Sequence, residues 1–228
     1  MSRLRLIFAV ALVPMMVTAC SSSTTGDTSK HATSTASAPT STQPLKVYTQ
    51  DELQPLLLAG GEALPGFTIA SGGDTNPTSD GFCGVAGRGL YTAAPPAVTS
   101  VTFDGADLGD NLGETLSAYS SEAAAASAFQ ETKSKLDSCP ANGTLGTGIQ
   151  IPYTLSKISV SLPGVDENAA YTLKLGSGID QGGVELIAAR KGTLMLGLIA
   201  VSLNGAGGTI LSQDVVDTFA QAAVKKLS

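Results

Sequence analysis

The sequence predicts an α+β fold in which an antiparallel β-sheet packs with two main helices, as a single domain behind a disordered tether. Apolar residues recur with helical period in residues 121–138 and again after Ser212. Apolar runs separated by Gly, Pro, Asp or Asn occupy much of 98–119 and 149–203, as expected of antiparallel strands. Strand and helix do not alternate repeatedly, so a Rossmann-type fold is not expected.

The first 19 residues have the layout of a secretory signal peptide. Arg3 and Arg5 precede an apolar run that is shorter than the roughly 20 residues needed to span a bilayer. Val17–Ala19 then lead directly into Cys20, which resembles the lipobox of bacterial lipoproteins. The resemblance implies cleavage before Cys20, fatty acylation of its sulfur and a membrane anchor at the extracytoplasmic face. The alternative is a plain signal peptide followed by a chance cysteine.

Residues 20–43 are expected to be a disordered tether. They consist mostly of Ser, Thr, Ala and Pro and have almost no large apolar side chain to bury. A Ser/Thr/Pro-rich stalk outside the cell is also a candidate for glycosylation, a hypothesis that mass spectrometry of the native protein tests. The globular domain is then expected at residues 44–228, which is long enough for one sizeable core.

The charge balance excludes some partners. The chain has 13 Lys and Arg against 19 Asp and Glu, a net charge of −6. No basic stripe with interleaved aromatic residues occurs, so nucleic acid is not an expected partner. The membrane is expected to be contacted through the lipid anchor, since an acidic domain is not attracted to anionic headgroups.

The three cysteines have separate expected roles. With Cys20 lipidated, Cys83 and Cys139 remain in an oxidising compartment and are predicted to form a disulfide. Closing that loop is worth roughly 4 kcal/mol in the chain-entropy model. The alternatives are two separately buried thiols and, less favoured, a metal site, for which two cysteines without histidine are a poor ligand set.

The first part of the domain is predicted to contain a short helix and several strands. Thr49 and Glu52 have capping-box spacing, Pro55 limits the helix, and Gly60-Gly61 ends it. An extended segment at 67–71 leads into a loop at 72–81 that is rich in Gly, Asp, Asn and Pro. Strands are expected at 98–103 and 113–119.

Residues 121–138 carry the strongest helix pattern. Ser120 or Ser121 can cap the helix, Glu122 suits the helix dipole in the first turn, and Pro140 stops the helix. One face carries the residues expected to be buried: Ala125, Phe129, Thr132 and Leu136. Cys139 follows Leu136 by three residues and is therefore expected on the same side.

The last part of the chain is predicted to be a run of strands and a final helix. The expected strands are 149–155, 157–162, 170–175, 184–190 and 193–203. Gly192 is expected at the tip of a hairpin, in the position that needs positive φ. The strand 193–203 is apolar on nearly every residue and is expected to be central. Ser212 is predicted to cap the final helix.

No catalytic, metal or cofactor site is selected by the sequence, and the protein is not expected to be an enzyme. Its only histidine, His31, lies in the tether, which excludes His-based triads and the usual zinc sites from the domain. The glycine-rich segment 84–89 lacks the Lys-Ser/Thr of a phosphate loop. Asp104, Asp107 and Asp110 are expected to form a solvated acidic turn, with a calcium site as the less favoured alternative.

The order of these features resembles a known family. The segments DELQPLLLAGGEALPGF and SSEAAAASAFQETKSKLDSC, with Cys83 between them and a C-terminal helix, look like actinobacterial lipoproteins related to the extracellular sensor domain of PknH-type mycobacterial receptor kinases. The resemblance implies an antiparallel sheet with flanking helices and a cleft for an unknown extracellular ligand. That family often has a second disulfide and a tryptophan, and this chain has neither. No ligand-binding residue is therefore assigned.

Three functions are compatible with this sequence. The first is a lipid-anchored, sensor-like domain that binds a small or cell-envelope molecule in a mainly apolar cleft between sheet and helix. The second is an accessory lipoprotein that docks on an envelope protein, which an exposed apolar patch would favour. The third is a hydrolase that uses carboxylates alone, which two close acids with shifted pKa values would favour.

Overall fold

The computed structural model describes residues 46–60, 62, 64–74, 82–85, 89–106, 109–145, 150–177, 180–203 and 211–228. Residues Thr42–Ser228 form one compact unit. The signal peptide 1–19, the lipidation site Cys20 and the tether 20–43 lie outside the described residues. In the part that is described, no helix has the length and apolar character required to cross a membrane.

Short helices, strands and two long helices follow one another in an order close to the predicted one. The elements are α1 (Gln50–Leu53), η1 (Gln54–Leu56), β1 (Thr68–Asp74), β2 (Ala97–Asp104), β3 (Asp110–Ala118), α2 (Glu122–Asp137), β4 (Asn142–Leu145), β5 (Ile151–Ile158), β6 (Glu167–Ser177), β7 (Asp180–Lys191), β8 (Leu194–Ser202) and α3 (Gln213–Lys226).

All eight strands belong to one antiparallel sheet with the order β1-β2-β3-β8-β7-β6-β5-β4. This confirms the predicted α+β class. The strand predicted to be central, β8, lies between β3 and β7, where Leu196 pairs with Leu116 on one side and Ala189 on the other. Gly192, at the β7–β8 turn, has the predicted positive φ of 58°.

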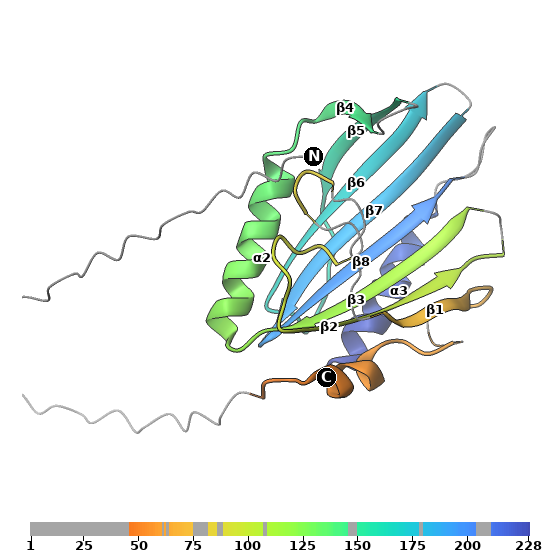
Figure 1. Cartoon of the computed structure of the whole chain (residues 1–228). Coiled ribbons are helices and arrows are strands. Elements are labelled where there is room, and N and C mark those ends of the chain that lie inside the picture. Colours follow the sequence, from red (N-terminus) through yellow and green to blue (C-terminus); the bar gives the residue numbers. More distant parts are fainter. Residues whose placement is uncertain are drawn as a thin grey trace, which may run out of the picture. The chain divides into compact units, whose positions relative to one another are not determined.

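Helices cover both faces of the sheet (Figure 1). On one side, which we call the α3 face, buried residues of α1 and α3 pack on β2, β3, β7 and β8. Phe103 and Phe219 meet there edge to face, with ring centroids 6.2 Å apart. On the opposite side, the α2 face, Phe129 and Leu136 pack with residues from β5, β6 and β7.

The long helix α2 forms as its sequence predicts. The Oγ of Ser121 accepts a hydrogen bond from the Ala124 N–H at 3.1 Å, which satisfies one of the free amide groups at the helix start. The buried residues are the predicted set: Ala125, Phe129, Thr132 and Leu136. In α3, Ser212 lies at the N-cap position, but its side chain makes no capping hydrogen bond, so that part of the prediction is wrong.

Parts of the strand prediction need correction. The expected strands 149–155 and 157–162 are one strand in the structure, β5, which ends at Ile158, and Leu162 is buried without belonging to a strand. The strand β4 was not predicted. The strand β1 extends to Asp74 and so includes residues that were expected to lie in the loop 72–81.

Candidate functional site

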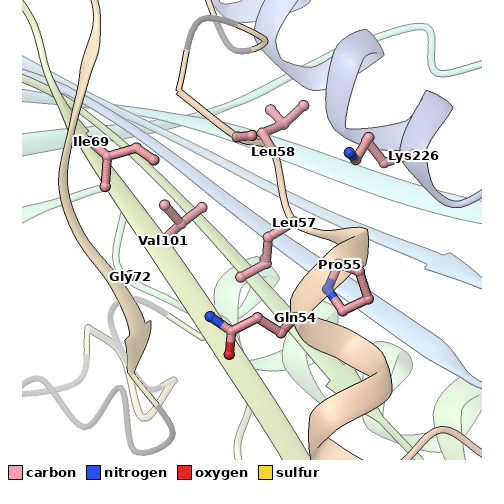
Figure 2. A pocket seen from close by; sticks show the side chains of 9 residues that line it. Gln54, Pro55, Leu57, Leu58, Ile69, Gly72, Val101 and Lys226 are labelled. Atoms are coloured by element: carbon pink, nitrogen blue, oxygen red, sulfur yellow. The ribbon is translucent and has the colours of Figure 1, made fainter.

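A mainly apolar cavity of about 220 Å³ opens on the α3 face, between η1, the first two strands and the end of α3. It is lined by Gln54, Pro55, Leu57, Leu58, Ala59, Ile69, Gly72, Val101 and Lys226. Figure 2 shows the side chains of Leu57, Leu58, Ile69 and Val101 gathered around one space, with Lys226 extending toward it from α3. The position agrees with the expected apolar cleft between sheet and helix.

The wall formed by residues 54–59 is held in place from both ends. At its start, the carboxylate of Glu52 accepts hydrogen bonds from Thr49, from the N–H at 2.9 Å and the hydroxyl at 3.0 Å. Gln50 ties the same helix to β2, since its Oε1 accepts from the Val98 N–H at 3.3 Å. Leu53 anchors the helix in the core with none of its surface exposed.

An ion pair closes the other end of the wall. The ammonium of Lys226 lies 3.1 Å from the carboxylate of Glu62, which also accepts a hydrogen bond from the Ala59 N–H at 2.8 Å. These contacts lower the pKa of Glu62, first through the Ala59 N–H and then through Lys226. Glu62 is therefore ionised at neutral pH, and it joins the wall to α3.

A carboxyl group lies buried behind this wall. Glu114 of β3 has no exposed surface, and one of its oxygens, Oε2, accepts a hydrogen bond from the Leu58 N–H at 2.9 Å. Its other oxygen, Oε1, has no hydrogen-bond partner among the described residues. Burial raises the pKa of Glu114 to about 7, against the opposing effects of the Leu58 N–H and the Lys226 charge. Glu114 therefore exchanges a proton near neutral pH.

Other buried polar atoms without a partner in the described structure are hydroxyls. They are Thr99 Oγ1, Ser117 Oγ and Tyr119 Oη. Burial raises the pKa of Tyr119 to about 12, so that hydroxyl stays neutral. A neutral hydroxyl is less costly to bury than a carboxyl group that ionises near pH 7. Glu114 is consequently the most unusual buried group among those the structure describes.

Glu114 was not predicted from the sequence, although a signal was present. Along β3, Leu112 and Leu116 point to the α3 face, and side chains two residues apart share a face. Glu114 therefore occupies a core position in an otherwise apolar pattern. The cavity itself could not be located from the sequence, because its walls come from segments far apart in the chain.

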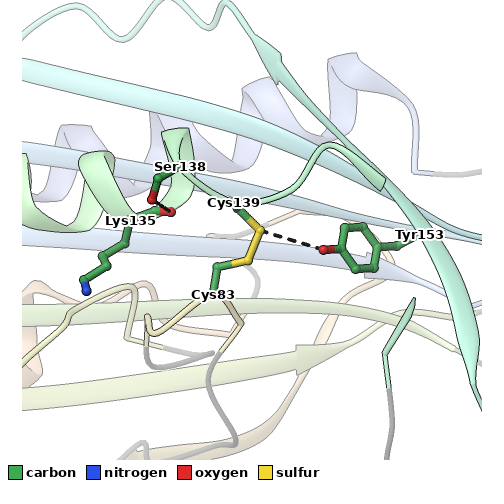
Figure 3. Close-up of a disulfide and its surroundings, with 5 residues drawn as sticks. All are labelled: Cys83, Lys135, Ser138, Cys139 and Tyr153. Atoms are coloured by element: carbon green, nitrogen blue, oxygen red, sulfur yellow. Dashed lines mark hydrogen bonds between the residues drawn. A yellow bond between two sulfur atoms is a disulfide. The ribbon is translucent and has the colours of Figure 1, made fainter. Parts of the chain in front are cut away.

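The predicted disulfide is present in the structure. Cys83 and Cys139 are bonded, with Cα atoms 5.7 Å apart, and join a tight turn to the end of α2 (Figure 3). Cys83 and Gly84 both have positive φ, 54° and 78°, and the Val85 N–H donates to the Phe82 carbonyl at 3.0 Å. Because this turn is held against α2 on the opposite face of the sheet, it supports the fold and does not contact the cavity.

The acidic turn is hydrogen-bonded in the structure. Asn111 donates to Asp104 at 3.0 Å, and the hydroxyl of Ser202 donates to Asp110 at 2.7 Å. Asp107 and the glycine-rich residues 86–88 lie outside the described residues. Within the part of the chain that is described, no cluster of three or more metal-ligating side chains occurs.

Comparison with known proteins finds a likeness at the level of the fold. No family model matches the chain, and no curated protein matches it either. The fold is similar to that of the extracellular domain of PknH from Mycobacterium tuberculosis, with a TM-score of 0.57 over 81% of this chain and 99% of that one. The two sequences are 13% identical, so the likeness shows a shared fold alone. The resemblance that the sequence suggested is therefore supported at the level of the fold.

Proposed function

We propose that this protein is an extracytoplasmic lipoprotein whose domain binds a small or cell-envelope molecule in the cavity on the α3 face. The observation that carries the proposal is an apolar cavity whose lining residue Leu58 donates its N–H to a buried, half-satisfied carboxyl group. Binding sites commonly combine apolar walls with a few polar groups whose pKa values are shifted by their surroundings. The fold shared with an extracellular domain supports a sensor-like role.

A ligand screen with a blocked cavity tests the binding site. The chain from residue 20 with Cys20→Ser is screened by thermal shift against fractions of a cell-envelope extract. The blocking variant is Gly72→Val: a Cβ added at Gly72 meets Val101 at an ordinary 3.7 Å, so the new side chain enters the cavity without a clash at the backbone. A fraction that stabilises the parent protein and fails to stabilise Gly72→Val supports the proposal.

A matched pair of surface changes controls for general effects on the sheet. Ile69 lines the cavity on β1 and is 50% exposed, whereas Ile151 lies on β5 and is 42% exposed. Ile69→Ser is expected to reduce the stabilisation by the ligand fraction, and Ile151→Ser is expected to leave it unchanged. Equal effects of the two substitutions, or no stabilisation by any fraction, would remove the support for this cavity as a binding site.

The membrane anchor is tested separately. Cys20 is proposed to carry the lipid, and at least two acyl chains are needed for stable anchoring because one holds only weakly. In the native host, Cys20→Ser is expected to move the protein from the membrane fraction to the soluble fraction. Its mature mass is expected to lack the acyl groups. Unchanged partitioning and mass would contradict lipidation at this residue.

A carboxylate-based hydrolase is the second candidate, and one observation favours it. Glu62 and Glu114 both lie near Lys226, and their pKa values are shifted in opposite directions, as in acid and base pairs. A general acid must reach the reacting atom, however, and Glu114 has no exposed surface. Hydrolysis of chromogenic esters or glycosides that disappears in Glu62→Gln would establish this function in place of simple binding.

Docking on an envelope protein receives no comparable support. The exposed large hydrophobic residues among those described are Val47, Ile69, Ile151 and Leu203. They belong to four different segments of the chain. Single exposed apolar residues are ordinary on soluble domains and do not mark an interface.

A further inference from the structure

The strongest unexplained feature of the cavity is the free oxygen of Glu114. The residues opposite Glu114 on the neighbouring strands are Val101 and Leu198, both buried and apolar. Directly opposed side chains in a sheet lie about 5 Å apart, so the carboxyl group has apolar walls on both sides. Native structures leave few buried polar groups unsatisfied, and those that persist are candidates for a functional role.

Two of the residues that line the cavity are direct neighbours of this carboxyl group. Leu58 lines the cavity with its side chain and donates its N–H to Oε2 of Glu114. Val101 also lines the cavity while standing opposite Glu114. Glu114 is therefore not itself a lining residue, but it neighbours two residues that line the cavity, Leu58 and Val101.

The surrounding charges restrict the group that can approach Oε1. A charged ligand of either sign would lose its hydration among apolar walls. An anion would also meet the carboxylates of Glu62 and Glu114, and a cation would meet the ammonium of Lys226, which lines the cavity and is already paired with Glu62. An uncharged hydrogen-bond donor avoids both repulsions, and it supplies what an unpartnered carboxyl oxygen lacks.

The volume restricts the size of the apolar part. An apolar cavity of about 150 Å³ is sufficient to bind benzene. Pockets for drug-sized ligands span roughly 300–1,000 Å³. The cavity of about 220 Å³ lies between these values, so it suits a single ring or the end of a short alkyl chain.

We propose that the ligand is an apolar molecule that presents one uncharged donor, a hydroxyl or an amide N–H, to Oε1 of Glu114. This inference rests on the proposed function, because it assumes that the cavity is a binding site. The side chain of Leu58 turns aside to admit the donor, while its N–H stays on Oε2. The two oxygens of one carboxyl group thus hold the wall and the ligand separately.

Four probes of similar size test this chemistry. They are 1-hexanol, 1-methoxypentane, hexylammonium and hexanoate, titrated at pH 8, where Glu114 is ionised and Oε1 can only accept, into the ¹⁵N-labelled chain from residue 20 with Cys20→Ser. Dissociation constants are taken from the amide shifts of Leu58 and Val101. We expect 1-hexanol to bind roughly tenfold more tightly than 1-methoxypentane, which has an oxygen but no donor; one hydrogen bond to a buried group accounts for that ratio. Both charged probes are expected to bind more weakly than 1-hexanol.

The variant Glu114→Gln tests the role of the carboxyl group without removing the bond to the wall. Its carbonyl oxygen can accept the Leu58 N–H, which leaves an amide NH₂ where Oε1 stood. A donor then faces a donor, so the preference for 1-hexanol over 1-methoxypentane is expected to disappear. Retained dispersion of the amide spectrum shows that the variant is folded, and a tenfold preference that survives in Glu114→Gln would overturn the inference.

The outcomes separate this inference from the function on which it rests. If all four probes shift Leu58 and Val101 with equal affinity, the cavity binds ligands but Glu114 does not select them, and the inference fails alone. If no probe shifts these amides, the inference fails together with the assignment of the cavity as the binding site. A hydroxyl preference that depends on Glu114 supports both.

Discussion

Glu114→Gln is expected to make the protein more stable at pH 8 and to change its stability much less at pH 5. At pH 5 the buried carboxyl group of Glu114 is protonated in the folded protein and is close in size and polarity to a glutamine side chain. At pH 8 it is ionised, and it then carries a charge in a position with no exposed surface and, among the described residues, no salt-bridge partner of its own. Glutamine avoids that charge at both pH values.

The size of the effect follows from the difference between the pKa of Glu114 in the folded protein and its pKa in the unfolded chain. The pKa of Glu114 is raised by burial from 4.5 to about 7 in the folded protein. Between these values the folded protein holds a proton that the unfolded chain releases, so the free energy of unfolding falls as the pH rises. The pKa difference corresponds to about 3 kcal/mol of the free energy of unfolding. This contribution is lost progressively as the pH rises from 4.5 to above 7. Small domains are stable by only about 5–15 kcal/mol, so this change is readily measured.

Urea unfolding at pH 5, 6, 7 and 8 and constant ionic strength measures this change. The quantity of interest is the free energy of unfolding of Glu114→Gln minus that of the parent, because His31 and the other titrating groups are common to both proteins. Glu52→Gln provides the control. Hydrogen bonds from Thr49 and Lys46 lower the pKa of Glu52, so its titration lies below this pH range and its effect is expected to be constant.

A flat difference between parent and Glu114→Gln from pH 5 to pH 8 would refute this reasoning. It would mean that Glu114 is ionised throughout, as a solvated or fully paired carboxylate is. The absence of the burial effect would also remove the physical basis for treating its free oxygen as a special feature of the cavity.

Three further predictions concern the rest of the domain. The double substitution Cys83→Ser and Cys139→Ser is expected to lower the free energy of unfolding by about 4 kcal/mol in urea, from the entropy of a loop with a sequence separation of 56. Arg190 is 13% exposed and binds Glu167 at 2.7 Å, so Arg190→Lys is expected to cost about 1.5 kcal/mol by the same assay because lysine cannot reproduce the fork of donors. Asp137 has its pKa lowered to about 2 by Lys133 and then by Tyr171. Its stabilising effect is present above the unfolded value and lost as the pH falls towards 2, so Asp137→Asn is expected to destabilise the domain at pH 6 by about 0.5 kcal/mol, and not at pH 2.

The sequence determines those elements whose signals are local. The capping serine, the periodic apolar residues and the following proline identify α2, because each acts within a few residues of the helix. The apolar run in β8 predicts a central strand, because only a strand covered on both faces is apolar at consecutive positions. The fold class follows from the order of these elements.

Edges and boundaries of the sheet are less well encoded. The strand β4 has only four residues, lies at the sheet edge and buries no side chain fully, so it lacks the apolar pattern of a strand. The apolar residues after Ile158 suggested a second strand, but Val160 and Leu162 pack on the α3 face from an irregular segment. In both places contacts with distant parts of the chain decide the structure, and no local pattern reports them.

In the candidate site, too, local patterns could be predicted from the sequence and contacts between distant residues could not. Glu114 was detectable as a charged residue at a core position of β3, since its neighbours Leu112 and Leu116 set the pattern. The pKa of Glu114 and its hydrogen bonding could not be predicted. They depend on the Leu58 N–H, 56 residues earlier, and on the ammonium of Lys226 near residue 228. The pKa and hydrogen bonds of a buried carboxyl group depend on its tertiary contacts. The sequence predicted the fold class and the order of the elements, but not those contacts.

The identity of residue 114 is difficult to explain by stability alone. An apolar side chain of similar size would suit a position flanked by Val101 and Leu198, and it would avoid the loss of about 3 kcal/mol that ionisation of Glu114 causes at neutral pH. The bond from the Leu58 N–H offsets part of that loss and fixes the wall, but a neutral glutamine could accept the same bond. What glutamine cannot provide in addition is a second free acceptor oxygen on a residue that neighbours the cavity wall. That oxygen is the physical difference between a carboxyl group that merely supports the wall and one that also holds a ligand.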